Sequence, residues 1–122
     1  MSFMKIIFVT TICFFLCLSY SFANSANPLS GNQNAINMGK KLYNIKCSKC
    51  HGPKARGINN GHTKTPDLSK YKRGYISFID VLVNGYARMP AWGGMGELNN
   101  VQMDQLASYI ESLSNNNLKW IE

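Results

Sequence analysis

The stretch that decides the fold of this chain is Cys47-Ser48-Lys49-Cys50-His51. It forms the C-x-x-C-H pattern to which a c-type haem is attached. Two thiols at this spacing on a helical turn can each add to a vinyl group on one edge of a porphyrin. The histidine that follows is then held beneath the ring, where its imidazole can ligate the iron. A haem held without covalent bonds would need only the ligand, so the spacing predicts one covalently bound haem c.

Residues 1–23 are typical of a secretory signal peptide. Lys5 supplies a short positive region, Ile6–Leu18 is an apolar run, and Ser21-Phe22-Ala23 places small residues at a suitable cleavage site. The apolar run is short for a membrane span, which needs roughly twenty residues. We therefore expect cleavage after Ala23 and a periplasmic protein. An uncleaved membrane anchor is the alternative.

The expected cleavage also simplifies the cysteines. It removes Cys13 and Cys17, so the mature protein keeps only Cys47 and Cys50. An exported C-x-x-C pair alone would suggest a disulfide or a redox pair, but the histidine that follows favours haem attachment, which uses both thiols. A thioredoxin-like pair needs a βαβ context that the chain lacks. A zinc site that also used His62 would contain adjacent Cys and His ligands, which matches no usual zinc spacing.

Positive charge is concentrated around this motif. The formal net charge is +7, and eleven basic residues between Lys40 and Arg88 face only two acidic ones, whereas four acidic residues face one lysine from Met89 onward. As a set beside a redox site, these cations are suited to steer the protein onto an acidic partner, with Lys46 and Lys49 nearest the thiols. Nucleic acid is a poor alternative, because no recognition motif is present.

One helix is expected before the motif and one loop after it. Residues 24–33 are polar with Pro and Gly, which is typical of a flexible arm. From Asn34, the candidate N-cap, apolar residues recur at helical spacing as far as Ile45. Between Gly52 and Pro66, glycines and prolines exclude long regular structure, which predicts a loop along one side of the haem.

Two further helices are expected. Apolar residues in Tyr75–Val83 predict a helix that ends at the Asn-Gly pair following it. Met103–Leu113 contains the clearest apolar stripe, with a cap at Asn99 or Asn100. No stretch alternates convincingly with period two. Residues 34–122 are therefore predicted to form one all-α domain of three to four helices.

Iron that shuttles electrons without binding small molecules needs a second axial ligand from a distant part of the chain. Met38 and Met103 lie on apolar helical stripes, where core packing is the expected role. Met89 is the best candidate, because it follows a helix and one short turn and because Pro90 stiffens the backbone after it. The full set of candidates is Met38, Met89, Met95, Met103 and His62.

Four motifs, in this order, resemble a class I monohaem cytochrome c of the small bacterial electron-carrier type. They cover most of the expected mature chain and match that family's first helix and haem turn, the proline after its proximal loop, its distal-ligand loop and its last helix. The residues that carry the resemblance are Gly39-x-x-Leu42-Tyr43 with the C-x-x-C-H-Gly pattern, Pro66-Asp67-Leu68, Met89-Pro90-Ala91-Trp92 and Leu106-x-x-Tyr109-Ile110-x-x-Leu113.

The resemblance implies a cytochrome c fold wrapped around one covalently bound haem. Its first and last helices would cross at close range at Gly39, with Tyr43 and Tyr109 packing around the crossing. The Pro66 carbonyl would accept a hydrogen bond from Nδ1 of His51 and so orient the ring. The candidates to bind the haem propionates are Tyr71, Arg73 and Trp92.

We therefore expect a monomeric electron carrier, not an enzyme, that shuttles single electrons between redox proteins with acidic docking surfaces. It would meet the membrane only through partner complexes. The resemblance points to periplasmic dehydrogenases, including quinoprotein alcohol dehydrogenases, and to terminal oxidases, without choosing between them. Two alternatives stay open. One is a peroxidase-like haem enzyme or gas-binding cytochrome with an open distal site, and the other is a fixed subunit of a dehydrogenase complex.

Overall fold

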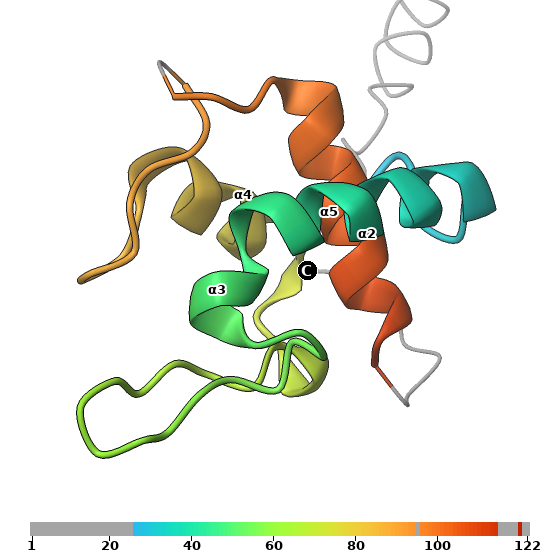
Figure 1. Ribbon diagram of the computed structural model, residues 1–122. Helices are drawn as coiled ribbons and strands as arrows, with labels where there is room; N and C mark the ends of the chain where they lie inside the picture. The colour runs from blue at the N-terminus through green and yellow to red at the C-terminus, as the bar shows by residue number, and fades with distance from the viewer. Residues whose placement is uncertain (1–25, 95, 115–119, 121–122) are drawn as a thin grey trace, which may run out of the picture.

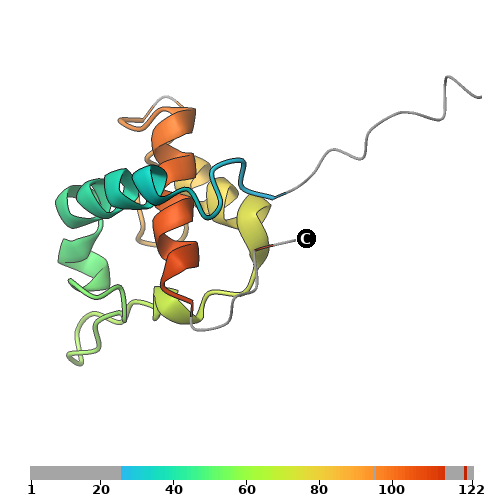
Figure 2. The ribbon, with the colours of Figure 1, turned by 90° about the vertical axis from the view of Figure 1, so that its right-hand side faces the viewer.

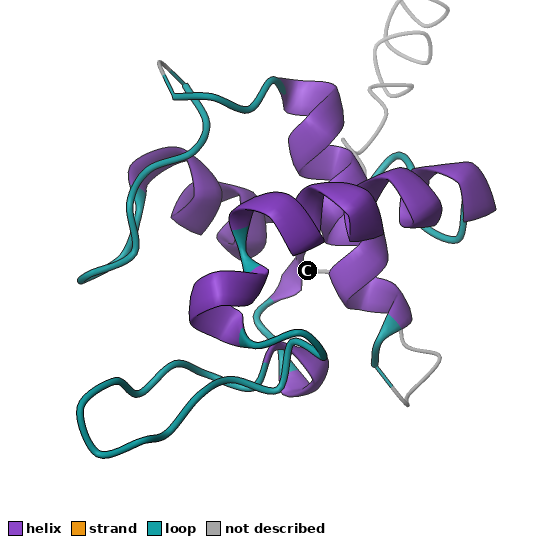
Figure 3. Cartoon of the chain, viewed as in Figure 1, coloured by secondary structure: helices purple, strands orange, loops and turns teal. Residues whose placement is uncertain are grey.

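The computed structural model describes residues 26–94, 96–114 and 120 of the chain. These residues form helices joined by loops, with two isolated bridges and no strand, so the all-α prediction is confirmed (Figure 3). None of the described helices is long and apolar enough to span a membrane. The predicted signal peptide over 1–23 and the candidate ligand Met95 lie outside the described residues. The elements in chain order are α2 (Gln33–Lys46), α3 (Ser48–His51), the 3-10 helix η1 (Leu68–Lys70), α4 (Gly74–Asn84) and α5 (Asn100–Ser112).

The N-cap of α2 is Asn32, so the predicted cap at Asn34 is wrong. Asn32 has an extended backbone (φ −75°, ψ 114°), and its side chain accepts a hydrogen bond from the Ala35 N–H at 3.0 Å. A turn through Gly31 (φ +73°) precedes it, closed by the Asn32 N–H donating to the Leu29 carbonyl at 3.1 Å. Both asparagines are good caps by residue type. The turn at Gly31 selects the first of them.

Helices α2 and α5 cross at Gly39 (Figure 2). A Cβ added at Gly39 would overlap the Gln105 carbonyl and lie 2.9 Å from the Cβ of Tyr109. The rings of Tyr43 and Tyr109 pack beside the crossing with centroids 5.3 Å apart. The missing side chain therefore lets the two backbones approach, as the resemblance implied.

Helix α4 packs against α5 and ends where the sequence predicts. Its C-cap is Gly85 (φ +73°), whose N–H donates to the Val81 carbonyl at 2.9 Å. Glycine adopts this left-handed backbone without the strain that a Cβ would cause. The buried core residues of these two helices are Phe78, Leu82, Met103, Leu106, Ala107, Tyr109 and Ile110.

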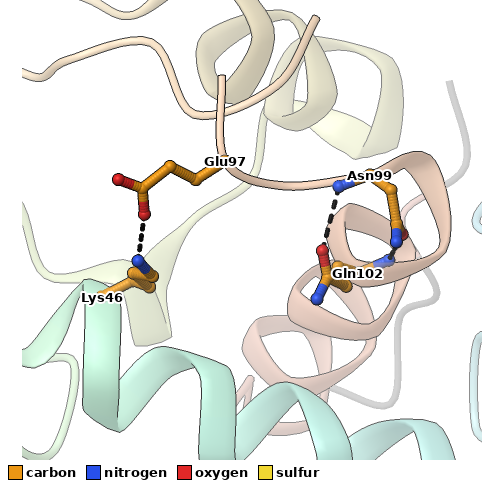
Figure 4. Close-up of polar contacts among 4 residues, drawn as sticks. All are labelled: Lys46, Glu97, Asn99 and Gln102. Carbon is orange, nitrogen blue, oxygen red and sulfur yellow. Dashed lines mark hydrogen bonds and ion pairs between the residues drawn. The ribbon is translucent and has the colours of Figure 1, made fainter. Parts of the chain in front are cut away.

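Helix α5 begins with a capping box (Figure 4). The Asn99 side chain accepts from the Gln102 N–H at 2.9 Å, and the Gln102 side chain accepts from the Asn99 N–H at 3.0 Å. Of the two predicted caps, Asn99 is therefore the one used. The box satisfies two N–H groups that have no partner within the helix.

One residue outside the helices is buried near each end of the described chain. Asn27 is 5% exposed and donates to Oγ of Ser108 at 2.9 Å, so this part of the arm predicted to be flexible contacts α5. Trp120 is 6% exposed, and its ring centroid lies 5.0 Å from that of Tyr71 and 5.1 Å from that of Phe78. Helical periodicity predicts neither contact.

We expect Gly39→Ala to destabilise the protein by about 1–3 kcal/mol, because the added methyl group overlaps the Gln105 carbonyl. Helix propensity alone acts in the opposite direction and would stabilise the variant by about 1 kcal/mol. Denaturant unfolding of the haem-loaded protein measures the difference, with Lys40→Ala at the next, exposed position as the control. A variant as stable as the wild type would contradict the close crossing.

Candidate functional site

The two thiols and the histidine of the C-x-x-C-H motif lie on one helical turn. Cys47 is the N-cap of α3, which contains Cys50 and His51. The N–H groups of Cys50 and His51 donate to the Cys47 carbonyl at 3.1 and 2.9 Å and close the turn. Burial, together with the neighbouring Cys50, raises the pKa of the Cys47 thiol to about 11. Neither cysteine forms a disulfide, so one turn presents two thiols for thioether bonds.

His51 is partly buried and lies close to Pro66. Its Nδ1 atom is buried and makes no hydrogen bond of regular geometry. Burial lowers the pKa of His51, and the Pro66 backbone partly opposes this shift. The ring is therefore a neutral imidazole at neutral pH, which is the form that ligates a metal. The Pro66 carbonyl is near enough to influence the ring, although the hydrogen bond implied by the resemblance lacks regular geometry.

Hydrogen bonds to the backbone of two glycines, Gly52 and Gly57, hold the loop that follows His51. The carbonyl of Gly52 (φ +82°) accepts a hydrogen bond from the Tyr43 hydroxyl at 2.5 Å. Burial raises the pKa of Tyr43, so the phenol keeps its proton and donates it. The Gly57 N–H donates to the His51 carbonyl at 2.9 Å, and a Cβ added at Gly57 would lie 2.8 Å from the Pro66 oxygen. The loop can thus bring Pro66 back toward His51.

Met89 ends a tight turn after α4. Tyr86 and Met89 exchange two backbone hydrogen bonds, at 3.1 and 2.8 Å, and Ala87 between them has φ +50°. A Cβ added at Gly85 would lie 2.6 Å from the Met89 oxygen. Glycine at the end of α4 is therefore needed for a second reason, because it lets the turn fold back closely.

The segment after Met89 is bonded to α4 as well. The Leu82 carbonyl accepts hydrogen bonds from the N–H groups of Trp92 and Gly93, at 2.7 and 3.0 Å. Helix ends leave such carbonyls without a partner inside the helix. The backbone that carries Met89 is thus restrained both before and after the residue.

Several predicted site residues pack on one core. The partly buried side chains of Cys47, Tyr71, Met89 and Trp92 all contact the same buried cluster. In Figure 1, α3 and the orange loop formed by residues 85–94 and 96–98 lie on the same, left-hand side of the molecule. Arg73 differs from this group, because it is exposed at the N-cap of α4.

The other described candidates for the distal ligand differ from Met89 in exposure. His62 is exposed in its loop. Met103 is 2% exposed in the core, which confirms the expected packing role. Met38 is 39% exposed, so the same expectation is wrong for it. The buried stripe of α2 includes the neighbouring Gly39 instead, and Met38 lies beside that stripe.

One contact at the site has no signal in the sequence. Nζ of Lys46 forms an ion pair with Glu97 (Figure 4), and it also lies 5.7 Å from the centroid of the Trp92 ring. Lys46 directly precedes Cys47, whereas Glu97 and Trp92 follow Met89. From the sequence, Lys46 was expected only to contact a partner. The pair spans 51 residues of sequence, which no local pattern can indicate.

These residues fit a covalently held haem. Two free thiols on one turn, a neutral imidazole next to them and a thioether on a restrained loop are groups that could hold a c-type haem. Because Nδ1 of His51 is buried, Nε2 would be the nitrogen available to a metal. With the all-α fold and the close helix crossing, this donor set defines a class I monohaem cytochrome c.

Comparison with protein families leads to the same class. The chain belongs to the family described as cytochrome c oxidase, cbb3-type, subunit III, whose model matches residues 34–110. No solved structure matches the chain. The cofactor of this family is covalently bound haem c with its iron, and Cys47 and Cys50 lie inside the matched region. The protein therefore acts in haem-based electron transfer, and its partners are redox proteins.

We expect Tyr43→Phe to lower the free energy of unfolding by about 1–2 kcal/mol, because the buried Gly52 carbonyl loses its hydrogen-bond donor. Tyr86→Phe removes a hydroxyl from a side chain that is 68% exposed and is the matched control. Both variants are measured by denaturant unfolding of the haem-loaded protein. Equal stability of the two would show that the bond contributes nothing.

Proposed function

We propose that this protein carries single electrons through a haem c bonded to Cys47 and Cys50, with His51 and Met89 as the axial ligands. The observation that carries the proposal is the placement of Met89. It is held on a restrained turn and packs against the same core cluster as Cys47. The haem supplies a reversible one-electron change at its iron.

The side chains around the haem set its reduction potential and keep small molecules away from the iron. A neutral thioether and a neutral imidazole favour the ferrous over the ferric state, relative to anionic ligands, and so raise the reduction potential. Buried side chains such as Tyr43, Leu106 and Tyr109 disfavour the extra charge of the ferric state in the same direction. With His51 and Met89 both holding the haem iron, no position on it would remain open to oxygen or other small molecules. This favours a carrier over an enzyme.

Three residues remain our proposed contacts for the haem propionates. Tyr71 and Trp92 pack on the core at the site and carry a hydroxyl and an indole N–H. Arg73 is exposed and offers a positive charge to a carboxylate at the surface.

The partner is proposed from charge, targeting and family. The signal peptide over 1–23 directs a mature protein to the periplasm, where the basic segment Lys40–Arg88 steers it onto acidic surfaces. The family description names a subunit of a cbb3-type oxidase, which favours a terminal oxidase as the electron acceptor. A monomer that docks weakly and leaves quickly suits this role.

We expect the ferric wild type to show the near-infrared sulfur-to-iron charge-transfer band, and Met89→Ala to abolish it and lower the reduction potential. The physical reason is the loss of the thioether ligand. Met38→Ala is the control, because Met38 is a partly exposed methionine on α2. Rapid binding of cyanide or carbon monoxide by the wild type at neutral pH would instead favour the enzyme or gas-binding alternative.

We expect the complex with an acidic partner, captured from periplasm at low salt, to dissociate as salt rises, because exposed charges are screened. Lys49→Glu places the opposite charge between the two thiols and is expected to weaken binding roughly three- to tenfold. Lys70→Glu changes the net charge equally, but lies on η1 next to Asp67. If both variants weaken binding equally, the effect depends on net charge alone and not on the position of Lys49.

A further inference from the structure

Lys46 lies between the turn that carries the haem cysteines and the segment that follows Met89. It ends α2, directly before the first haem cysteine, and its side chain contacts two residues of the distal loop, which comprises residues 85–94 and 96–98. These are Glu97, with which it forms an ion pair, and Trp92, over whose ring its Nζ lies. The Lys46 side chain is 31% exposed, compared with 64% for Glu97. The three residues Lys46, Glu97 and Trp92 are named here the Lys46 clamp.

The backbone of the distal loop is rich in glycine, so contacts that restrain it have a large effect on its order. Gly93, Gly94 and Gly96 follow Met89 closely, and glycine loses more conformational freedom on ordering than any other residue. Backbone hydrogen bonds attach Trp92 and Gly93 to α4 through the Leu82 carbonyl. The Lys46 clamp attaches the same loop to α2, on the side of the haem cysteines.

We propose that Lys46 is a positioning residue for Met89. By holding Glu97 and Trp92, it keeps the distal loop closed and the Met89 sulfur on the iron. The inference rests on the proposed function, in which Met89 is the distal ligand. It assigns to Lys46 a role inside the haem site in addition to any contact with a partner.

The expected size of the effect follows from the exposure of the contacts. Exposed ion pairs are weak and screened by salt, and a cation over an indole ring adds a contribution of similar size. Together they are expected to change the population of the open loop by roughly three- to tenfold. This is too small to unfold the protein and large enough to measure.

The experiment uses the haem-loaded protein and two measurements. Amide exchange at Trp92 reports opening of the loop, and the rate at which imidazole binds the ferric form reports release of Met89. Lys46→Gln is expected to speed both roughly three- to tenfold at low salt. Glu97→Gln is expected to have a smaller effect, because the contact with Trp92 remains. Lys46→Arg is expected to restore both values, since a guanidinium pairs with carboxylates and stacks on aromatic rings.

Lys41→Gln is the matched control, because it removes the same charge from an exposed position on α2. We expect it to change neither measurement. Glu97→Gln should add nothing in the Lys46→Gln background if the two side chains act through each other. A full additional effect, or a Lys41→Gln variant equal to Lys46→Gln, would overturn the inference.

The near-infrared band separates this inference from the proposed function. If the wild type lacks the band, the assignment of Met89 fails and the positioning role fails with it. If the band is present and Trp92 exchange is unchanged in Lys46→Gln, the positioning role alone fails.

Discussion

The close crossing of α2 and α5 at Gly39 is the constraint on which the haem site depends. A side chain at this position would overlap the Gln105 carbonyl, so the approach of the two backbones requires glycine. Helix α3 begins at Ser48, one residue after the C-cap of α2, and the crossing therefore determines where Cys47 and His51 lie. Helix α5 contributes five of the eleven described residues of the buried core cluster, more than any other element, and Met89 packs against this cluster. The close approach of the two helices at Gly39 therefore affects both sides of the site.

The two proposed axial ligands are held in different ways. His51 lies on a helical turn whose hydrogen bonds are local, and its loop is closed by the Tyr43 hydroxyl and by Gly57. Met89 lies on a turn closed by its own backbone hydrogen bonds, and the segment after it is bonded to α4 at Leu82 and contacts α2 through the Lys46 clamp. The backbone of His51 is held by hydrogen bonds within its own helix. The distal side depends on contacts between segments that are far apart in sequence, and is therefore the side where substitutions can tune the iron.

The successes and failures of sequence reasoning follow the range of the interactions. The end of α4 at Gly85 was predicted correctly and Asn99 was one of the two caps predicted for α5, because a cap is a contact within one turn. The cap of α2 was placed at Asn34 instead of Asn32, because two good caps compete and the preceding turn decides. Met38 was assigned to the core, although the buried stripe of α2 passes beside it. Periodicity indicates a stripe but leaves its edge uncertain by one residue.

The sequence by itself determined the cofactor chemistry and the fold class. Covalent haem attachment depends on a spacing within five consecutive residues, and helices depend on patterns within a few turns, so both can be recognised locally. Only the tertiary structure decided that Asn27 packs on Ser108 and that Lys46 pairs with Glu97 across 51 residues of sequence. Neither contact is part of a pattern that repeats along the sequence, so periodicity cannot reveal it. The physical reason is that such pairs form only after the helices have packed, which brings distant segments within reach of one another.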